Sequence, residues 1–153
     1  MFKYRFEGYD MKLYALKSKE SDQEVIRKAL LDFVKSTKKD WNYITPEDLE
    51  KKGTDKFYIL DIRDKEAFKN GHIKGAKNIF WMDLLDEENL KKLPKNKKIL
   101  LVCYVGHTAS QMLVALALLG YKVTALKFGM GISPVEGVPV AGWTDFGFDT
   151  VEE

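Results

Sequence analysis

The only cysteine of the chain, Cys103, lies where a reactive thiol would be expected. It ends the apolar run 99–103, and Gly106 then leads into an apolar segment, 108–119, that has the length of a helix. Free N–H groups and the positive dipole end at a helix N-terminus stabilise an anion, and the thiolate is the nucleophilic form of cysteine. These residues alone leave two interpretations open, a nucleophile or a buried structural cysteine, since free cysteines also pack as small hydrophobic residues.

The elements that must position Cys103 alternate along the chain between strand and helix. Apolar, β-prone runs predict strands at 57–60, 79–81, 99–103 and 123–126. Capping residues, periodicity and terminal glycines predict helices at 21–34, 46–52, 64–70, 83–93 and 108–119, the last apolar on nearly all sides and therefore buried. Such alternation predicts an α/β fold with a mainly parallel sheet and helices on both faces. The carboxyl ends of its strands, Cys103 among them, would form the ligand crevice.

The length of 153 residues suits one domain. We expect residues 1–40 to form an N-terminal extension whose one amphipathic helix packs on the domain. Phe2, Tyr4 and Phe6 alternate with charged residues in this extension and predict a short edge strand. Residues 41–153 form the domain itself, and glycines, prolines and Trp143 predict an irregular tail after residue 129.

Composition excludes several classes of function. A hydrophobic share of 45% with 31% charged residues is typical of a soluble globular domain, and a net charge of +2 provides no broad field for nucleic acid. No apolar run approaches the ~20 residues that span a membrane. One cysteine cannot form an internal disulfide, and with only two histidines it offers few ligands for a metal. We therefore expect a cytoplasmic protein without membrane or nucleic-acid partners, although export from a longer precursor stays open.

Three motifs carry a family resemblance over about residues 44–131. After Cys103 come two residues, then Gly106, one further residue and Thr108. Upstream, Asp61-Ile62-Arg63 precedes Gly71-His72-Ile73-Lys74-Gly75-Ala76, and downstream Gly120-Tyr121 precedes Phe128-Gly129-Met130, with Phe128 where glycine is frequent. In this order the motifs resemble those of the single-domain rhodanese (sulfurtransferase) family.

The resemblance implies a three-layer sandwich and persulfide chemistry. Cys103 would be the catalytic residue that takes a sulfane sulfur from thiosulfate or another persulfide or polysulfide donor. It would pass the sulfur to a thiol, a cyanide-like acceptor or a protein, in two half-reactions with ping-pong kinetics. N–H groups of the loop would stabilise the anion; the loop residues are Tyr104, Val105, Gly106, His107, Thr108, Ala109 and Ser110. Asp61 and Arg63 would brace this loop as an ion pair, and no metal or organic cofactor is required.

Two positions depart from the pattern of the thiosulfate-using members and affect which sulfur donor is expected. Val105 and Ala67 stand where the two-domain, thiosulfate-using members have basic residues. We therefore expect thiosulfate to be a poor or surrogate donor. His107 either supplies a replacement cation by gaining a proton or fills an exposed loop position, and both alternatives remain open.

Competing functions differ in what they need from the loop. A cysteine phosphatase or arsenate reductase would require an arginine where Ala109 stands, and the arsenate reductase would also need a second cysteine. Both are therefore disfavoured. The serious alternative is a non-catalytic rhodanese-like module that binds a partner or carries sulfur when docked to one. For Arg63, contact with a substrate anion stays an alternative to bracing, and His72 is expected to hydrogen-bond backbone in a tight turn.

Overall fold

The computed structural model describes residues 21–38, 41–132 and 140–153. The chain divides into two compact units, residues 1–38 and residues 39–153. The strand expected around Phe2, Tyr4 and Phe6 lies outside the described residues. Within the described part, no helix is both long and apolar enough to cross a membrane.

In the first unit, the predicted amphipathic helix is confirmed as α2, Asp22–Ser36. The Ser21 hydroxyl accepts a hydrogen bond from the Glu24 N–H at 3.3 Å. The Glu24 carboxylate pairs with Arg27 at 2.7 Å, so the reciprocal half of the capping box is replaced by an ion pair along the helix. Packing of this helix on the domain stays a prediction.

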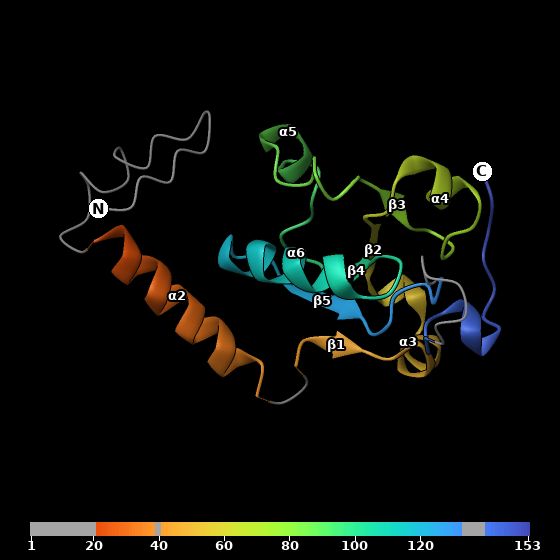
Figure 1. Cartoon of the computed structure of the whole chain (residues 1–153), viewed down its shortest axis with the longest axis horizontal. Coiled ribbons are helices and arrows are strands. Elements are labelled where there is room, and N and C mark those ends of the chain that lie inside the picture. The colour runs from red at the N-terminus through yellow and green to blue at the C-terminus, as the bar shows by residue number, and fades with distance from the viewer. Residues whose placement is uncertain (1–20, 39–40, 133–139) are drawn as a thin grey trace. The chain divides into compact units, whose positions relative to one another are not determined.

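The second unit is built on a five-stranded sheet in which every pair of neighbours is parallel. Its order is β1-β5-β4-β2-β3 (Figure 1), which confirms the predicted α/β class. The strands are β1 Tyr43–Ile44, β2 Tyr58–Asp61, β3 Lys77–Asn78, β4 Ile99–Val102 and β5 Val123–Leu126. All four residues of β4 are buried, as expected of a central strand covered on both faces.

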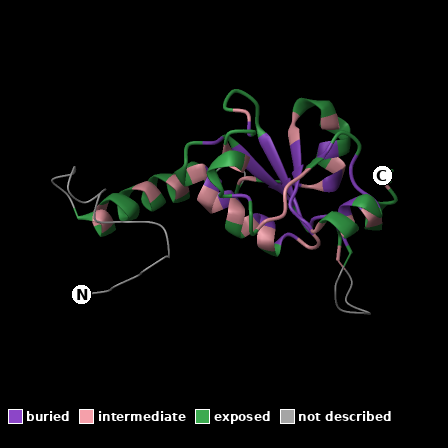
Figure 2. Ribbon diagram, turned by 90° about the horizontal axis from the view of Figure 1, so that it is seen from above, coloured by how far each residue is buried: buried purple, intermediate pink, exposed green. Residues whose placement is uncertain are grey.

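Helices cover the two faces of this sheet. Leu49 of α3 (Pro46–Lys52) and Phe68 of α4 (Lys65–Lys69) join one buried cluster with Leu100 of β4. Helix α6, His107–Leu118, contacts β4 and β5 from the other face. Figure 2 shows the buried residues concentrated in the strands between these layers. The predicted three-layer arrangement is therefore present.

Helix α6 is less enclosed than predicted. Only Ala109, Leu113 and Leu116 are buried, while Leu118 is 39% exposed. The apolar residues surround the helix, but a helix at the outside of a three-layer domain can press only one side against the sheet. The prediction of a buried helix is therefore wrong for the side that faces away from the sheet.

Two further predicted elements are shorter than expected. The helix expected at 83–93 is reduced to α5, Glu87–Leu90, because turns over 80–86 precede it and bury Leu84. The strand expected at 79–81 is displaced to Lys77–Asn78. After it, the N–H groups of Ile79 and Trp81 still donate to the carbonyls of Asp61 and Ile62, and the Asn78 amide donates to the carbonyls of Asp61 and Arg63, so this segment is bound to the end of β2 by single hydrogen bonds without forming a regular strand.

The described part of the tail is irregular, as predicted, apart from the short 3-10 helix Thr144–Phe146. Trp143 is buried, and its ring N–H donates to the Asp149 carbonyl at 2.9 Å. Val151 exchanges two backbone hydrogen bonds with His72. The tail is thereby fixed to the turn that follows α4.

Candidate active site

Cys103 follows β4 directly at the carboxyl edge of the sheet, and its side chain is buried, with 3% exposure. Its Sγ accepts hydrogen bonds from the backbone N–H of Gly106 at 3.2 Å and of Ala109 at 3.4 Å. Ala109 is the third residue of α6, so the sulfur occupies the place that a capping side-chain oxygen takes at other helices. Such N–H groups stabilise a sulfur anion without a charged side chain.

Gly106 makes this geometry possible. It precedes α6 with φ of 95° in the left-handed region, and the helix has no side-chain cap of its own. A Cβ on Gly106 would lie 3.4 Å from the Phe128 nitrogen, so the close approach of that segment also favours glycine. The turn thus directs two N–H groups to one sulfur.

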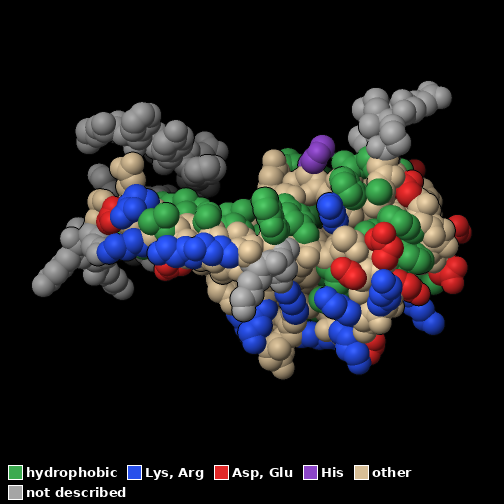
Figure 3. Space-filling view, turned by 90° about the horizontal axis from the view of Figure 1, so that it is seen from below, with side chains coloured by type: hydrophobic (Ala, Val, Ile, Leu, Met, Phe, Trp, Pro, Cys, Tyr) green, Lys and Arg blue, Asp and Glu red, His purple; other side chains and the backbone are tan. Residues whose placement is uncertain are grey.

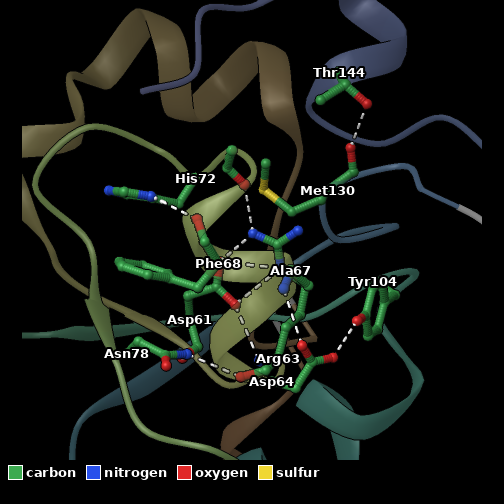
Figure 4. A network of polar contacts seen from close by, with 11 residues as sticks. Asp61, Arg63, Asp64, Ala67, Phe68, His72, Asn78, Tyr104, Met130 and Thr144 are labelled. Atoms are coloured by element: carbon green, nitrogen blue, oxygen red, sulfur yellow. Dashed lines mark hydrogen bonds and ion pairs between the residues drawn. The ribbon is translucent and has the colours of Figure 1, made fainter. Parts of the chain in front are cut away.

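The segment after β5 holds the loop from the other side. The N–H groups of Met130 and Gly131 donate to the carbonyls of Cys103 and Tyr104 at 2.9 and 3.0 Å. Gly129 lies so close that a Cβ on it would be 2.2 Å from the Cys103 carbonyl oxygen. Thr144 of the tail donates through its N–H and its hydroxyl to the Met130 carbonyl (Figure 4). The loop backbone is therefore fixed by a segment 25 residues or more away in sequence.

The predicted loop residues divide by what they contact. Gly106 and Ala109 alone donate their N–H groups to the sulfur among the described contacts, so the other predicted N–H donors are not directed at it. The Ser110 hydroxyl donates to the Gly106 carbonyl and accepts from the Tyr43 hydroxyl. His107 is exposed, while Val105, Thr108 and Tyr104 are half-buried.

Asp61 and Arg63 form the predicted ion pair at the end of β2 (Figure 4). The guanidinium donates from Nε and Nη2 to both carboxylate oxygens, with Nη2 at 2.6 Å, and Nη2 also donates to the Gly71 carbonyl at 2.7 Å. The Nη1 group has no hydrogen-bond partner among the described residues. Arg63 is 1% exposed. Its hydrogen bond to the Gly71 carbonyl braces that turn, and its Cζ lies 5.7 Å from the centroid of the Tyr104 ring. This geometry favours bracing over contact with a substrate.

His72 belongs to the same brace. Its Nδ1 donates to the Phe68 carbonyl at 2.8 Å, and its ring stacks on Phe68 at 3.8 Å between centroids. The expected backbone hydrogen bond in a tight turn is confirmed.

Sequence reasoning missed one residue of the site, Asp64. Its carboxylate caps α4 by accepting from the Ala67 N–H and also accepts from the Tyr104 hydroxyl at 2.5 Å. Burial and this hydrogen bond raise the pKa of Tyr104 to about 12, while the same bond lowers the pKa of Asp64. The cap pattern at 64–67 predicted the helix, but nothing in it indicated a partner 40 residues away.

No group of three or more metal-ligating side chains occurs among the described residues. Residues Cys103–Ser110 contain neither lysine nor arginine. The site therefore offers one sulfur, two converging N–H groups and no fixed cation in the loop.

Replacing Gly129 by alanine is expected to destabilise the domain through the contact with Cys103. Gly147→Ala is the matched control, since Gly147 also has positive φ, 71° against 55°, but nothing lies within 4 Å of the added Cβ. The control should cost about 1 kcal/mol in the free energy of unfolding, and Gly129→Ala about 2 kcal/mol more. Urea unfolding of both variants measures this, and equal losses would contradict it.

Replacing Tyr104 by phenylalanine should make a pH-dependent difference in stability. The lowered pKa of Asp64 means that its bond stabilises the fold above the ordinary carboxyl pKa of about 4 and is lost as pH falls below it. The raised pKa of Tyr104 means that the bond is also lost as pH rises from about 10 towards 12. Urea unfolding at stepped pH should show the gap between wild type and Tyr104→Phe widest between these limits.

Tyr121→Phe is the control for this measurement, because the Tyr121 hydroxyl donates to a carbonyl, that of Leu90. Its stability gap should not change between pH 3 and 7. A constant gap for Tyr104→Phe as well would refute the proposed coupling to Asp64.

Comparison with known proteins agrees with this geometry. The chain is 29% identical over 124 residues to a tRNA sulfurtransferase of Pyrobaculum aerophilum, covering 79% of this chain and 24% of that protein. It thus spans about a quarter of that relative's length.

Solved structures with the same fold include a rhodanese-related protein from Thermoplasma volcanium, with a TM-score of 0.61 and 22% identity over 72% of this chain and 98% of that one. A rhodanese-like domain protein from Staphylococcus aureus has a TM-score of 0.54 and 26% identity over 64% and 96%. The family model described as the rhodanese-like domain matches residues 45–131, which hold β2, the Asp61–Arg63 brace and the whole Cys103 loop. The chain is a member of the rhodanese-like domain family.

Proposed function

We propose that the protein is a sulfurtransferase that carries a sulfane sulfur on Cys103 as a persulfide. The observation that carries the proposal is the pair of N–H groups, from Gly106 and Ala109, that converge on Sγ. A sulfur-related function is common to this family and to the tRNA sulfurtransferase relative. Because the matched part is a quarter of that relative, its tRNA substrate is not carried over.

The cycle has two displacement steps. The Cys103 thiolate attacks the outer sulfur of a donor R–S–S⁻, the donor S–S bond breaks, and RS⁻ leaves with the electron pair. Cys103 then holds an anionic persulfide, which the same backbone donors stabilise. An acceptor nucleophile attacks the outer sulfur, the new S–S bond breaks, and the Cys103 thiolate returns. No net oxidation occurs, and the two half-reactions are separate in time.

The charges around the loop affect which sulfur donor loads Cys103 fastest. Thiosulfate is a dianion, and the loop lacks a lysine or arginine to pair with it. The carboxylate of Asp64, bonded to Tyr104 in the loop, adds a negative charge nearby. We infer that donors of lower charge, such as an organic persulfide, which is a monoanion, load Cys103 faster than thiosulfate.

Cys103→Ser should abolish sulfur loading while leaving the domain folded. The intact mass of the protein, taken after incubation with polysulfide, should increase by one sulfur atom in the wild type and not in the variant. Cyanide should remove the added sulfur as thiocyanate. If the wild type gains no sulfur from polysulfide or thiosulfate, the sulfurtransferase proposal fails and a partner-binding module becomes the leading function.

Val105→Arg should raise the use of thiosulfate, because it restores a cation to the loop. With cyanide as acceptor, kcat/KM for thiosulfate is expected to rise about tenfold, the effect of one charge-assisted hydrogen bond. Val105→Gln supplies an uncharged hydrogen-bond donor on a shorter side chain and serves as the control. Equal activities of the two variants would show that missing charge does not limit thiosulfate.

A further inference from the structure

A hollow of about 540 Å³ lies beside the active-site loop, on the side of β1 and β5. Gly106 and His107 line it, and the Gly106 N–H donates to Sγ, so the hollow borders the loop that holds the reactive sulfur, although Cys103 itself is not among the lining residues. The residues that line it also include three aromatic ones, Trp41, Tyr43 and Phe128. Figure 3 shows hydrophobic side chains at the surface near a histidine and basic side chains on this side of the domain.

The backbone around the hollow is unusual. Trp41, Asn42 and Phe128, with φ of 56°, 56° and 61°, are the non-glycine residues with positive φ in the described part of the chain. Two of them line the hollow, and Asn42 stands between Trp41 and Tyr43. For bulky side chains this conformation costs free energy, and such residues are concentrated at functional sites.

Hydrogen bonds of neighbouring residues fix the two turns that carry Trp41 and Phe128. The Asn42 carbonyl accepts from the Thr124 hydroxyl at 2.8 Å and from the Ala125 N–H at 2.9 Å, which fixes the corner before β1. Phe128 lies in the turn closed by the bond from the Gly129 N–H to the Leu126 carbonyl. Glycine would adopt the left-handed backbone at position 128 with less strain, so the turn itself gives no reason for a phenylalanine there.

The rings are nevertheless open to solvent. Trp41 is 76% exposed and Phe128 41% exposed, so neither supports the core. Tryptophan and tyrosine that are exposed around a hollow are enriched among the residues that contribute most to binding at protein interfaces. A small inorganic anion has no apolar part to bury there. The hollow therefore fits a macromolecular partner better than thiosulfate.

The charged groups around the hollow limit the partner further. Lys127 lies beside Phe128, its Nζ 5.3 Å from the ring centroid, and His107 is exposed near it. The carboxylate in the lining is Asp48 of α3. An acidic group of a partner would therefore be favoured on the Lys127 side, next to the apolar contact with Phe128.

We propose that this hollow docks the sulfur acceptor, and that the acceptor is a protein whose reactive cysteine follows a large apolar and an acidic residue. The proposal rests on the proposed function and specifies its second step. The apolar side chain lies between Trp41 and Phe128, and the acidic group pairs with Lys127. The acceptor thiolate attacks the outer sulfur of the Cys103 persulfide, takes it as a new persulfide and releases the Cys103 thiolate, so sulfur and charge balance.

The test measures sulfur transfer from protein loaded with polysulfide to two short peptides. In one peptide the cysteine follows an aspartate and a leucine, and in the other it follows two glycines. We expect kcat/KM about tenfold higher for the first peptide. Trp41→Ala and Phe128→Gly should each reduce this preference to about twofold or less. Phe128→Gly suits the left-handed turn, so its effect reports the lost ring rather than a damaged fold.

Met82→Ala is the matched control, because Met82 is 66% exposed and does not line the hollow. It should keep the full preference. Transfer to cyanide is measured for every variant, and the ratio of transfer to the first peptide over transfer to cyanide should fall about fivefold or more only for the hollow variants. Equal rates for the two peptides, or parallel losses with peptide and cyanide, would overturn the docking site. If polysulfide does not load Cys103 at all, the proposed function fails instead.

Discussion

The structure of the site depends on one constraint, the convergence of two backbone N–H groups on the sulfur of Cys103. For that convergence, β4 must end one residue before Cys103 and α6 must begin four residues after it, with the left-handed turn at Gly106 between them. The carbonyls of Cys103 and Tyr104 then accept hydrogen bonds from outside the loop, from the N–H groups of Met130 and Gly131. The environment of the sulfur therefore depends on the loop backbone, while loop side chains such as Tyr104 and Ser110 bond to residues other than Cys103.

The second requirement is a rigid neighbour for this loop. The Asp61–Arg63 pair is buried and satisfies the Gly71 carbonyl, while Asp64 bonds to Tyr104. A buried ion pair contributes little net stability, but it disfavours other conformations, because separating the pair would leave a buried charge without a partner. The turn after β2 and the loop after β4 are thereby held in register at the same edge of the sheet.

The order of the helices and of strands β2 to β5 could be predicted from sequence, because each of these strands lies in or beside a short apolar run and most helices have capping residues or glycine ends. Strand β1, only two residues long, was not predicted. The prediction failed where tertiary contacts decide. The regular strand ends at Asn78, whose amide bonds to carbonyls at the end of β2, and α6 leaves one side open although its sequence is apolar. The catalytic candidate followed from one cysteine in a motif. Asp64 and the aromatic hollow did not, because their partners are distant in sequence and Trp41 and Phe128 belong to no local pattern.

The strand order has a consequence for how the protein is made. Among the described strands, β1 pairs only with β5, and the Asn42 carbonyl accepts a hydrogen bond from Thr124, 82 residues later. During synthesis the first strand of the domain must therefore wait, unpaired, until the last has left the ribosome. Parallel pairings of such sequence separation form slowly, because the loop must close before contacts compensate its entropy. The corner that presents Trp41 is then among the last features to form, whereas β2 and β4 can pair earlier in translation.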